Sequence, residues 1–247
     1  MVRVLGMCLI LAAFGASAAE SAGKPVYFRT SARLSLDAQG VPQQVLLDGK
    51  LPAVVRSSIE QRVMQWRFEP ARLDGEPRSG ITTVFLSACA VPDAHGSGLR
   101  LAVDYDWNGP GYANGLPVVM PPRYPIDAAK SDKSGSFRVV MEIQPDGHAR
   151  IETIEPMKGQ LRYFEKTLRD WVAALRYIPE EVDGKPVASR VAMPVTFSTG
   201  DSGASFKDEM RARQNSPECV AAKAAHPGDD APRPVVLDSP FKPITTS

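Results

Sequence analysis

The side chains that could do chemistry are few in this sequence and lie far apart along it. The three histidines are His95, His148 and His226, and none lies at metal-ligand spacing from another histidine or from a cysteine. Cys89 and His95 would supply a nucleophile and a base, but a disulfide bond to Cys219 accounts better for this thiol. We therefore expect no metal site and no catalytic residue among them.

Two carboxylates, Asp104 and Asp106, flank Tyr105 and would suit a cation, but a strand with acidic outward positions explains them equally well. The chain has no phosphate loop, no dinucleotide fingerprint and no Gly-x-Ser-x-Gly nucleophile turn. The sequence therefore predicts a protein that is not an enzyme, that has no cofactor and that has no evident small-molecule substrate.

The charge balance excludes another class of partner. Lysine and arginine total 29 and aspartate and glutamate total 28, so the 247-residue chain has a net charge of +1. Binding to nucleic acid requires a basic patch or run, and no basic run here is longer than a dipeptide. We expect no nucleic-acid partner.

The N-terminus has the three parts of a secretory signal peptide. Arg3 precedes an apolar run from Val4 to Ala16, and small residues follow at Ala18 and Ala19. The run is shorter than the roughly 20 residues that cross a bilayer, which favours cleavage after Ala18 or Ala19 over an uncleaved anchor. Residues 1–19 are therefore predicted to be a signal peptide that exports the chain to the periplasm.

Two cysteines, Cys89 and Cys219, remain after that cleavage. Thiols tend to pair in an oxidising compartment, and a disulfide that closes so long a loop adds about 4–5 kcal/mol in the chain-entropy model. The prediction is a Cys89–Cys219 disulfide. The alternative is one buried thiol and one thiol in a loose tail.

One pattern of residues occurs twice. Each copy contains a strand ending in a turn glycine, a helical segment, an aromatic-x-Pro motif and an Asp-Gly turn, in the same order. Gly147 follows Gly40 by 107 positions, and three later landmarks of the second copy follow those of the first by 109. Those three pairs are Pro70 and Pro179, Gly75 and Gly184, and Pro77 and Pro186. The order and spacing predict an internal repeat.

The elements of each copy follow from local patterns. Residues 32–36 and 137–143 alternate apolar and polar side chains, as half-buried strands do, and Asp146-Gly147 suits a hairpin turn. Apolar residues recur at helical spacing in both copies, and a proline follows each predicted helix. The helical stripes are Val55, Ile59, Val63 and Trp66, and Phe164, Leu168, Val172 and Leu175; we expect Trp66, Phe68, Trp171 and Tyr177 to be core residues.

These elements predict an α+β fold with two tandem small domains, each an antiparallel sheet of about three strands with a helix packed on one face. The first domain spans residues 25–91 and the second spans residues 119–199. Residues 92–118 form a linker with one strand-like stretch. Residues 200–247 form a polar tail that we expect to be disordered at its extreme end.

The second copy resembles the C-terminal domain of TonB-type energy transducers. The resemblance is carried by Tyr124-Pro125 after Pro122, by Asp146-Gly147 and by the aromatic-x-Pro motif ending at Pro179. Further matches are Ala128-Ala129, the strand Gly135-x-Phe-x-Val, Asp183-Gly184-Lys-Pro186 and the closing stretch from Met193 to Phe197. The first copy looks like a degenerate relative that lacks the Tyr-Pro motif.

This resemblance implies a periplasmic protein that binds an extended segment of an outer-membrane receptor or another envelope protein. The partner would add as a strand to the free edge of the sheet. Carried over to this chain, the partner-binding residues are Tyr124, Pro125, Val191, Met193, Val195 and Phe197.

Two alternatives stay open at this point. One is a membrane-anchored energy transducer for outer-membrane transport, although no proline-rich spacer follows the apolar run. The other is a structural homodimer in which the sheet edges pair with each other or with a second chain.

Overall fold

The computed structural model describes residues 26–47, 49–92, 99–115, 119–198 and 234–246. The predicted signal peptide, His95, His226 and Cys219 lie outside these residues. Within the described ranges, no helix is both long enough and apolar enough to cross a membrane.

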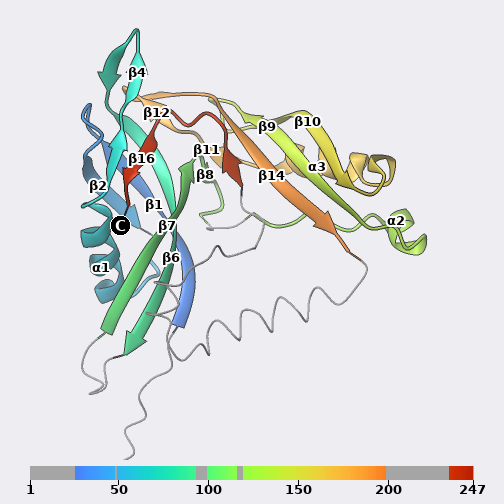
Figure 1. Ribbon diagram of the computed structural model, residues 1–247, viewed down its shortest axis with the longest axis horizontal. Coiled ribbons are helices and arrows are strands. Elements are labelled where there is room, and N and C mark those ends of the chain that lie inside the picture. The colour runs from blue at the N-terminus through green and yellow to red at the C-terminus, as the bar shows by residue number, and fades with distance from the viewer. Residues whose placement is uncertain (1–25, 48, 93–98, 116–118, 199–233, 247) are drawn as a thin grey trace, which may run out of the picture.

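The first half of the chain contains one helix and eight strands among its described residues (Figure 1). In chain order these are β1 (Val26–Leu36), β2 (Pro42–Leu47), α1 (Ala53–Val63), β3 (Arg67–Glu69), β4 (Ala71–Leu73), β5 (Glu76–Arg78), β6 (Gly80–Pro92), β7 (Leu99–Gly109) and β8 (Gly111–Tyr112).

The second half is described from residue 119 to 198 and again from 234 to 246. Its elements are α2 (Ile126–Lys130), β9 (Gly135–Ile143), β10 (Ala149–Lys158), the 3-10 helix η1 (Leu161–Tyr163), α3 (Glu165–Ala174), β11 (Tyr177–Ile178), β12 (Glu181–Val182), β13 (Lys185–Pro186), β14 (Ser189–Phe197), β15 (Val235–Val236) and β16 (Lys242–Thr245).

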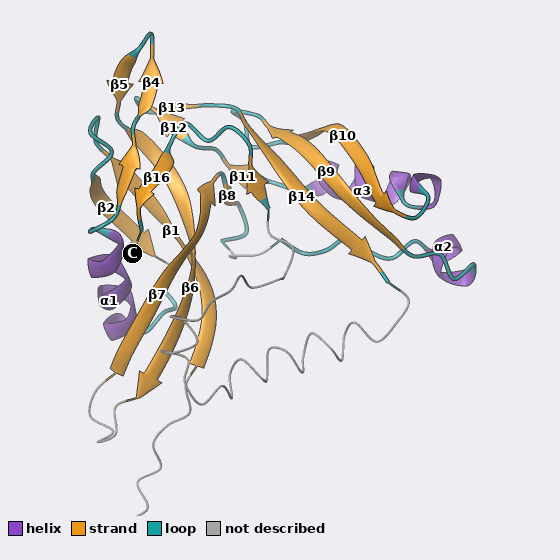
Figure 2. Ribbon diagram, viewed as in Figure 1, coloured by secondary structure: helices purple, strands orange, loops and turns teal. Residues whose placement is uncertain are grey.

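The N-terminal sheet has the order β13-β12-β6-β1-β2, and β7 also pairs with β6. The helix α1 covers one face of this sheet through Val55, Ile59 and Val63, which are all buried (Figure 2). These are the positions that the four-residue spacing predicted. Trp66 and Phe68, at 1% and 0% exposure, complete the same core.

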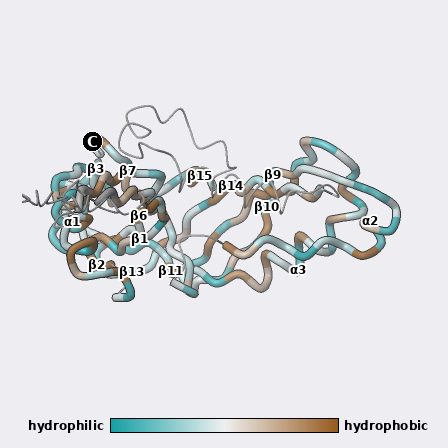
Figure 3. Tube along the Cα trace, turned by 90° about the horizontal axis from the view of Figure 1, so that it is seen from below, coloured by the Kyte–Doolittle hydropathy of each residue, from teal (hydrophilic) through white to brown (hydrophobic). Residues whose placement is uncertain are grey.

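The C-terminal sheet has the order β10-β9-β14-β15. The helix α3 lies behind it in the view of Figure 2 and buries Leu168 and Val172 against it. Phe164, just before α3, stacks on Phe197 with ring centroids 4.6 Å apart. In Figure 3, after a quarter turn, α1 and α2 lie at opposite ends of the molecule, and β11 and β15 lie near its middle.

The order β2-β1-β6 in the first sheet recurs as β10-β9-β14 in the second. A specific contact recurs with it. The N–H of Phe68 donates to the carbonyl of Gly40 at 3.0 Å, and the N–H of Tyr177 donates to the carbonyl of Gly147 at 2.9 Å. Both glycines have positive φ. A Cβ added to Gly40 would lie 1.7 Å from the carbonyl oxygen of Phe68, and a Cβ added to Gly147 would lie 2.3 Å from the carbonyl oxygen of Tyr177. Only glycine fits these two turns.

The sheets exceed the predicted three strands because other segments join them. The strand-like stretch of the predicted linker is β7, which lies along β6 from Thr83 to Pro92. The Asp-Gly hairpin of the second copy, β12–β13, adds to the N-terminal sheet beside Gly80 and Ile81. The extreme C-terminus, expected to be disordered, instead forms β15 and β16. It is held because Phe241 is fully buried in the core under α1.

The turn contacts give a direct stability test. We expect Gly147→Ala to lower the free energy of unfolding by about 3 kcal/mol, because the new methyl group collides with the Tyr177 carbonyl. Gly184→Ala is the matched control, since Gly184 also has positive φ (73°) but a methyl group added there would have no neighbour within 4 Å. It should cost only about 1 kcal/mol. Urea unfolding of both variants measures the difference, and equal losses would contradict the turn-packing explanation.

Candidate functional site

The outer edge of β14 is the edge that faces away from β9. At Arg190 the backbone carbonyl accepts a hydrogen bond from the N–H of Leu237 at 2.8 Å, and the backbone N–H donates to the Asp238 carboxylate. The backbone groups of Arg190 therefore point outward. Because strand residues alternate, the next outward groups belong to Ala192, Pro194 and Thr196.

Only the beginning of this edge is paired within the described part of the chain. The strand β15 lies antiparallel to β14 at Val191 and Ala192, and the described residues provide no pairing strand beyond that point. Proline has no N–H, so Pro194 offers only its carbonyl. A proline is tolerated at this position because its nitrogen faces away from β9. The open edge thus presents two carbonyls, of Pro194 and Thr196, and the N–H of Thr196.

A groove of about 490 Å³ lies beside this open edge. One wall is β14 itself, from Met193 to Thr196. The approach to α2 forms another wall, where the indole N–H of Trp171 donates to the Met120 carbonyl at 2.8 Å. That bond holds the segment in place and leaves the Met120 side chain 67% exposed.

The N-terminal sheet supplies the far wall of the groove. Phe85 of β6 and Trp107 of β7 stack with ring centroids 3.7 Å apart and planes 11° apart. Tyr112 of β8 meets Phe85 edge to face at 5.4 Å. Both sheets are therefore needed to form the groove.

The chemistry of the groove is apolar. Among the described residues that line it, Arg29 and Asp106 are the charged ones, and Asp106 accepts a hydrogen bond from the Ser87 hydroxyl at 3.0 Å. The remaining lining side chains are uncharged, and most are aromatic, aliphatic or proline. Ligand-binding sites are commonly apolar grooves with a few polar groups, and the described lining residues contain no nucleophile with an adjacent base.

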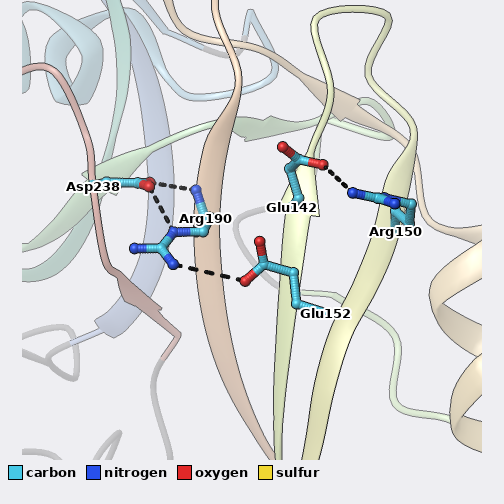
Figure 4. Close-up of polar contacts among 5 residues, drawn as sticks. All are labelled: Glu142, Arg150, Glu152, Arg190 and Asp238. Atoms are coloured by element: carbon cyan, nitrogen blue, oxygen red, sulfur yellow. Dashed lines mark hydrogen bonds and ion pairs between the residues drawn. The ribbon is translucent and has the colours of Figure 1, made fainter.

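A charged cluster fixes the C-terminal segment to the start of this edge (Figure 4). The guanidinium of Arg190 donates to Asp238 at 2.8 Å and lies 3.8 Å from Glu152. Its hydrogen bond to Asp238 raises the pKa of Arg190. On the neighbouring strands, hydrogen bonds from Gln144 and then Arg150 lower the pKa of Glu142. These contacts join β9, β10 and β14 to the C-terminal segment.

A buried polar network surrounds Glu180. Oε1 of Glu180 accepts hydrogen bonds from the hydroxyls of Thr82 (2.6 Å) and Ser239 (2.7 Å). The Asn108 amide donates to the same two hydroxyls and to the Phe241 carbonyl at 3.0 Å. Four separate segments of the chain meet in this network.

Glu180 is the only fully buried carboxylate among the described residues. Its Oε2 has no hydrogen-bond partner among them. Burial raises the pKa of Glu180 to about 7, although the bonds from Thr82 and Ser239 act in the opposite direction. The carboxyl group is therefore partly protonated at neutral pH.

The structure places the predicted Tyr-Pro pair next to the far end of β14. Tyr124 packs edge to face on Phe197 at 5.6 Å and on Phe164 at 6.1 Å, and its hydroxyl donates to the Lys133 carbonyl. Pro125 caps the start of α2. Neither residue lines the groove.

The other four predicted partner-binding residues, Val191, Met193, Val195 and Phe197, have side chains that are at most 7% exposed and face the core under α3. Their backbone groups point toward β9, so the outward groups belong to the residues between them. Met193 and Val195 nevertheless line the groove. Sequence reasoning missed the open-edge residues Pro194 and Thr196 and the groove walls outside β14. Pro194 was the available signal, since a proline inside a strand marks an edge.

Trp171, expected in the core, is partly exposed and lines the groove, whereas Tyr177 is buried as expected. Cys89 is buried and disulfide-bonded, but Cys219 lies outside the described residues, so their pairing stays a prediction. His148 is exposed in its hairpin turn. The described residues hold no cluster of three or more metal-ligating side chains.

The buried carboxyl group makes stability depend on pH. As pH rises from 4.5 to about 7, the unfolded chain releases the Glu180 proton before the folded protein does. The free energy of unfolding should therefore fall with rising pH in this window, by about 3 kcal/mol in total. Glu180→Gln should remove this fall, as measured by urea unfolding from pH 4.5 to 8.

The control for this measurement is Glu142→Gln, because Glu142 is partly exposed and its pKa is lowered. This control should keep the wild-type fall in stability between pH 4.5 and 7. An unchanged fall in Glu180→Gln would show that other groups cause the pH dependence.

Residues 120–199 match one family model, described as the Gram-negative bacterial TonB protein C-terminal. Domains of this family are non-enzymatic, act in the Gram-negative envelope and interact with proteins such as outer-membrane receptors. The match spans α2 to β14, so it contains the open edge and two of the three groove walls. No curated protein matches the chain.

Proposed function

We propose, on the premise that residues 120–199 form a TonB-type C-terminal domain, that this chain is a periplasmic protein–protein interaction module. It binds an extended segment of an outer-membrane receptor or another envelope protein, which adds as a strand to the outer edge of β14. The observation that carries the proposal is the row of outward carbonyl and N–H groups at Pro194 and Thr196, which lies beside an apolar groove.

The expected affinity is modest. A backbone hydrogen bond contributes about 1 kcal/mol net, and the open edge offers only a few such bonds before association costs are subtracted. Side chains that enter the groove add the rest of the binding energy. An interaction of this strength suits a partner that is held briefly and released.

We infer that the two halves are copies of one unit, and that within the described residues the outer edge is covered on β6 but open along the end of β14. The shared strand order and the repeated aromatic-to-glycine hydrogen bond support this inference. In the first copy, β7 and β12 occupy the outer edge of β6. The first copy then serves as a wall of the site and not as a second receptor.

The predicted residues keep roles under this proposal. Tyr124 and Pro125 shape the far end of the edge, because Tyr124 packs on Phe197. Val191, Met193, Val195 and Phe197 anchor β14 in its core, so they fix the outward groups of the residues between them. These are positioning roles.

The export prediction has a mass test. The mature protein from a Gram-negative host should begin at Ala19 or Glu20 and be recovered from the periplasm. It should also be lighter by the two hydrogens lost in forming the Cys89–Cys219 disulfide. A full-length species in the inner membrane would contradict the export prediction and favour an anchored transducer. A mature species with two free thiols would contradict the disulfide.

Strand addition has a test at a single amide. Nonapeptides selected from a random phage-displayed library on the full mature chain should slow hydrogen exchange of the Thr196 N–H at least about tenfold, because that N–H becomes hydrogen-bonded. NMR exchange rates measure the effect. The amides of β4 and β5, which pair only with each other, provide the control.

Bound peptides that leave Thr196 exchange unchanged would contradict strand addition at this edge. A homodimer through the same edge would instead protect the Thr196 amide without peptide, and would do so in proportion to protein concentration.

A further inference from the structure

A second hollow in the C-terminal half is separate from the groove beside β14. Its volume is about 420 Å³, and it lies between residues 132–134, which follow α2, and residues 158–163, which run from the end of β10 through η1. This part of the molecule is at the far end from α1 (Figure 1). No described residue lines both the hollow and the groove. We call it the basic hollow, for the charges that line it.

Three cations line the basic hollow: Lys133, Lys158 and Arg162. Asp132 is the one carboxylate among its described lining residues, so the side chains give it a net charge of +2. None of the three cations forms an ion pair with a described residue, whereas the adjacent helix α3 pairs both of its cations with carboxylates four residues away. Like charges repel, so a bound anion would stabilise this arrangement.

The turn after α2 fixes the backbone of Lys133. Its N–H donates to the Ala128 carbonyl at 2.8 Å, and the N–H of Asp132 donates to the Ala129 carbonyl at 3.1 Å. Asp132 has a positive φ of 49°, so these two bonds form a Schellman cap at the end of the helix. The carbonyl of Lys133 accepts a hydrogen bond from the Tyr124 hydroxyl. Both backbone groups of Lys133 are therefore held.

The loop after β10 packs closely against this turn. Gly159 has a positive φ of 84°, and a Cβ added there would lie 2.5 Å from the Ser134 carbonyl oxygen. The guanidinium of Arg162 lies 4.8 Å from the centre of the Tyr163 ring and donates to the Tyr163 hydroxyl at 3.0 Å. The aromatic ring thus positions the cation. Positioning before binding reduces the entropy that a ligand must overcome.

We propose that the basic hollow binds a phosphomonoester group or inorganic phosphate. Such a group carries a charge of about −1.5 to −2 at neutral pH, which matches the hollow better than the single charge of a carboxylate does. The planar guanidinium of Arg162 can donate two N–H groups to its oxygens, and Lys133 and Lys158 supply compact positive charges. This inference goes beyond the proposed function and does not depend on it.

The same chemistry has two possible sources. One is a soluble phosphate compound, and the other is a lipid headgroup at a membrane surface, which would bring this end of the molecule to the membrane. The hollow is within the size range of small-molecule sites, and its lysines are exposed. Both sources are therefore tested with the same variants.

The chain offers a matched pair of charge reversals. Lys158→Glu places a negative charge in the basic hollow. Lys185→Glu makes the same change on β13, outside the hollow, at a lysine that also forms no ion pair with a described residue. Both side chains are exposed, so urea unfolding should show the same stability for both variants. The two variants have the same net charge, so general attraction to anions falls equally in both.

The experiment uses the full mature chain. Inorganic phosphate is titrated while amide resonances are followed by NMR, with sodium chloride at equal ionic strength as the reference. We expect saturable shifts at Lys133, Gly159 and Arg162. The dissociation constant should rise at least about tenfold in Lys158→Glu and stay within about twofold of wild type in Lys185→Glu. Flotation with vesicles of phosphatidic acid and phosphatidylcholine in equal parts, compared with phosphatidylcholine alone, tests the lipid source.

The two probes distinguish the sources. Saturable binding of phosphate alone, lost in Lys158→Glu and kept in Lys185→Glu, would support the proposal with a soluble ligand. The same variant pattern with phosphatidic acid vesicles would support it with a lipid headgroup. Equal weakening in both variants would show attraction by net charge only and would overturn the proposal. An absence of saturable binding to both probes would overturn it as well.

Discussion

The architecture depends on one central strand, β6, whose two rows of backbone groups must both be satisfied. On one side, β6 pairs with the whole length of β1. On the other side, it pairs with β7 and β12. A central strand cannot leave either row unpaired when it is buried. Because β12 comes from the second half of the chain and β7 from the first, the pairing of β6 brings both halves into one structure.

The position of the groove follows from this sharing. With β12 attached beside Gly80, the chain leads directly into β14, and the edge of β14 comes to lie across from β7. A Cβ on Gly80 would lie 2.0 Å from the Glu181 carbonyl oxygen, so the strands can approach this closely only at a glycine. The Glu180 network and the buried ring of Phe241 then hold the segment before β12 and the C-terminal segment against β6 and β7.

The sequence predicted the local elements well because their signals are local. Apolar spacing identified the buried faces of α1 and α3, and the recurring glycines marked both hairpin turns. Pairing between distant segments has no such local signal. The alternation of side chains in β7 indicates a strand, but it does not indicate that this strand pairs with β6. The same limit explains why Phe241, a lone aromatic in a polar tail, was not expected in a core.

The candidate site illustrates what a resemblance can and cannot supply. It directed attention to β14, yet it selected residues whose side chains face inward. Which backbone groups point outward depends on the parity of the β9–β14 register, and Arg190 reveals that parity only through its contacts with the C-terminal segment. Trp107 and Phe85 reach the site from another part of the chain, so no local pattern around β14 could have included them.

Pro194 has a consequence for behaviour at high concentration in a crowded compartment. An exposed strand edge is a template for aggregation, because identical edges can pair and the ladder can then propagate. A proline in the outward row removes one donor from each chain, so two β14 edges would face each other with gaps in their hydrogen-bonding. A ligand that brings its own donors can still pair with the remaining carbonyls. The same residue thus keeps the edge available to a partner and discourages fibre growth from it.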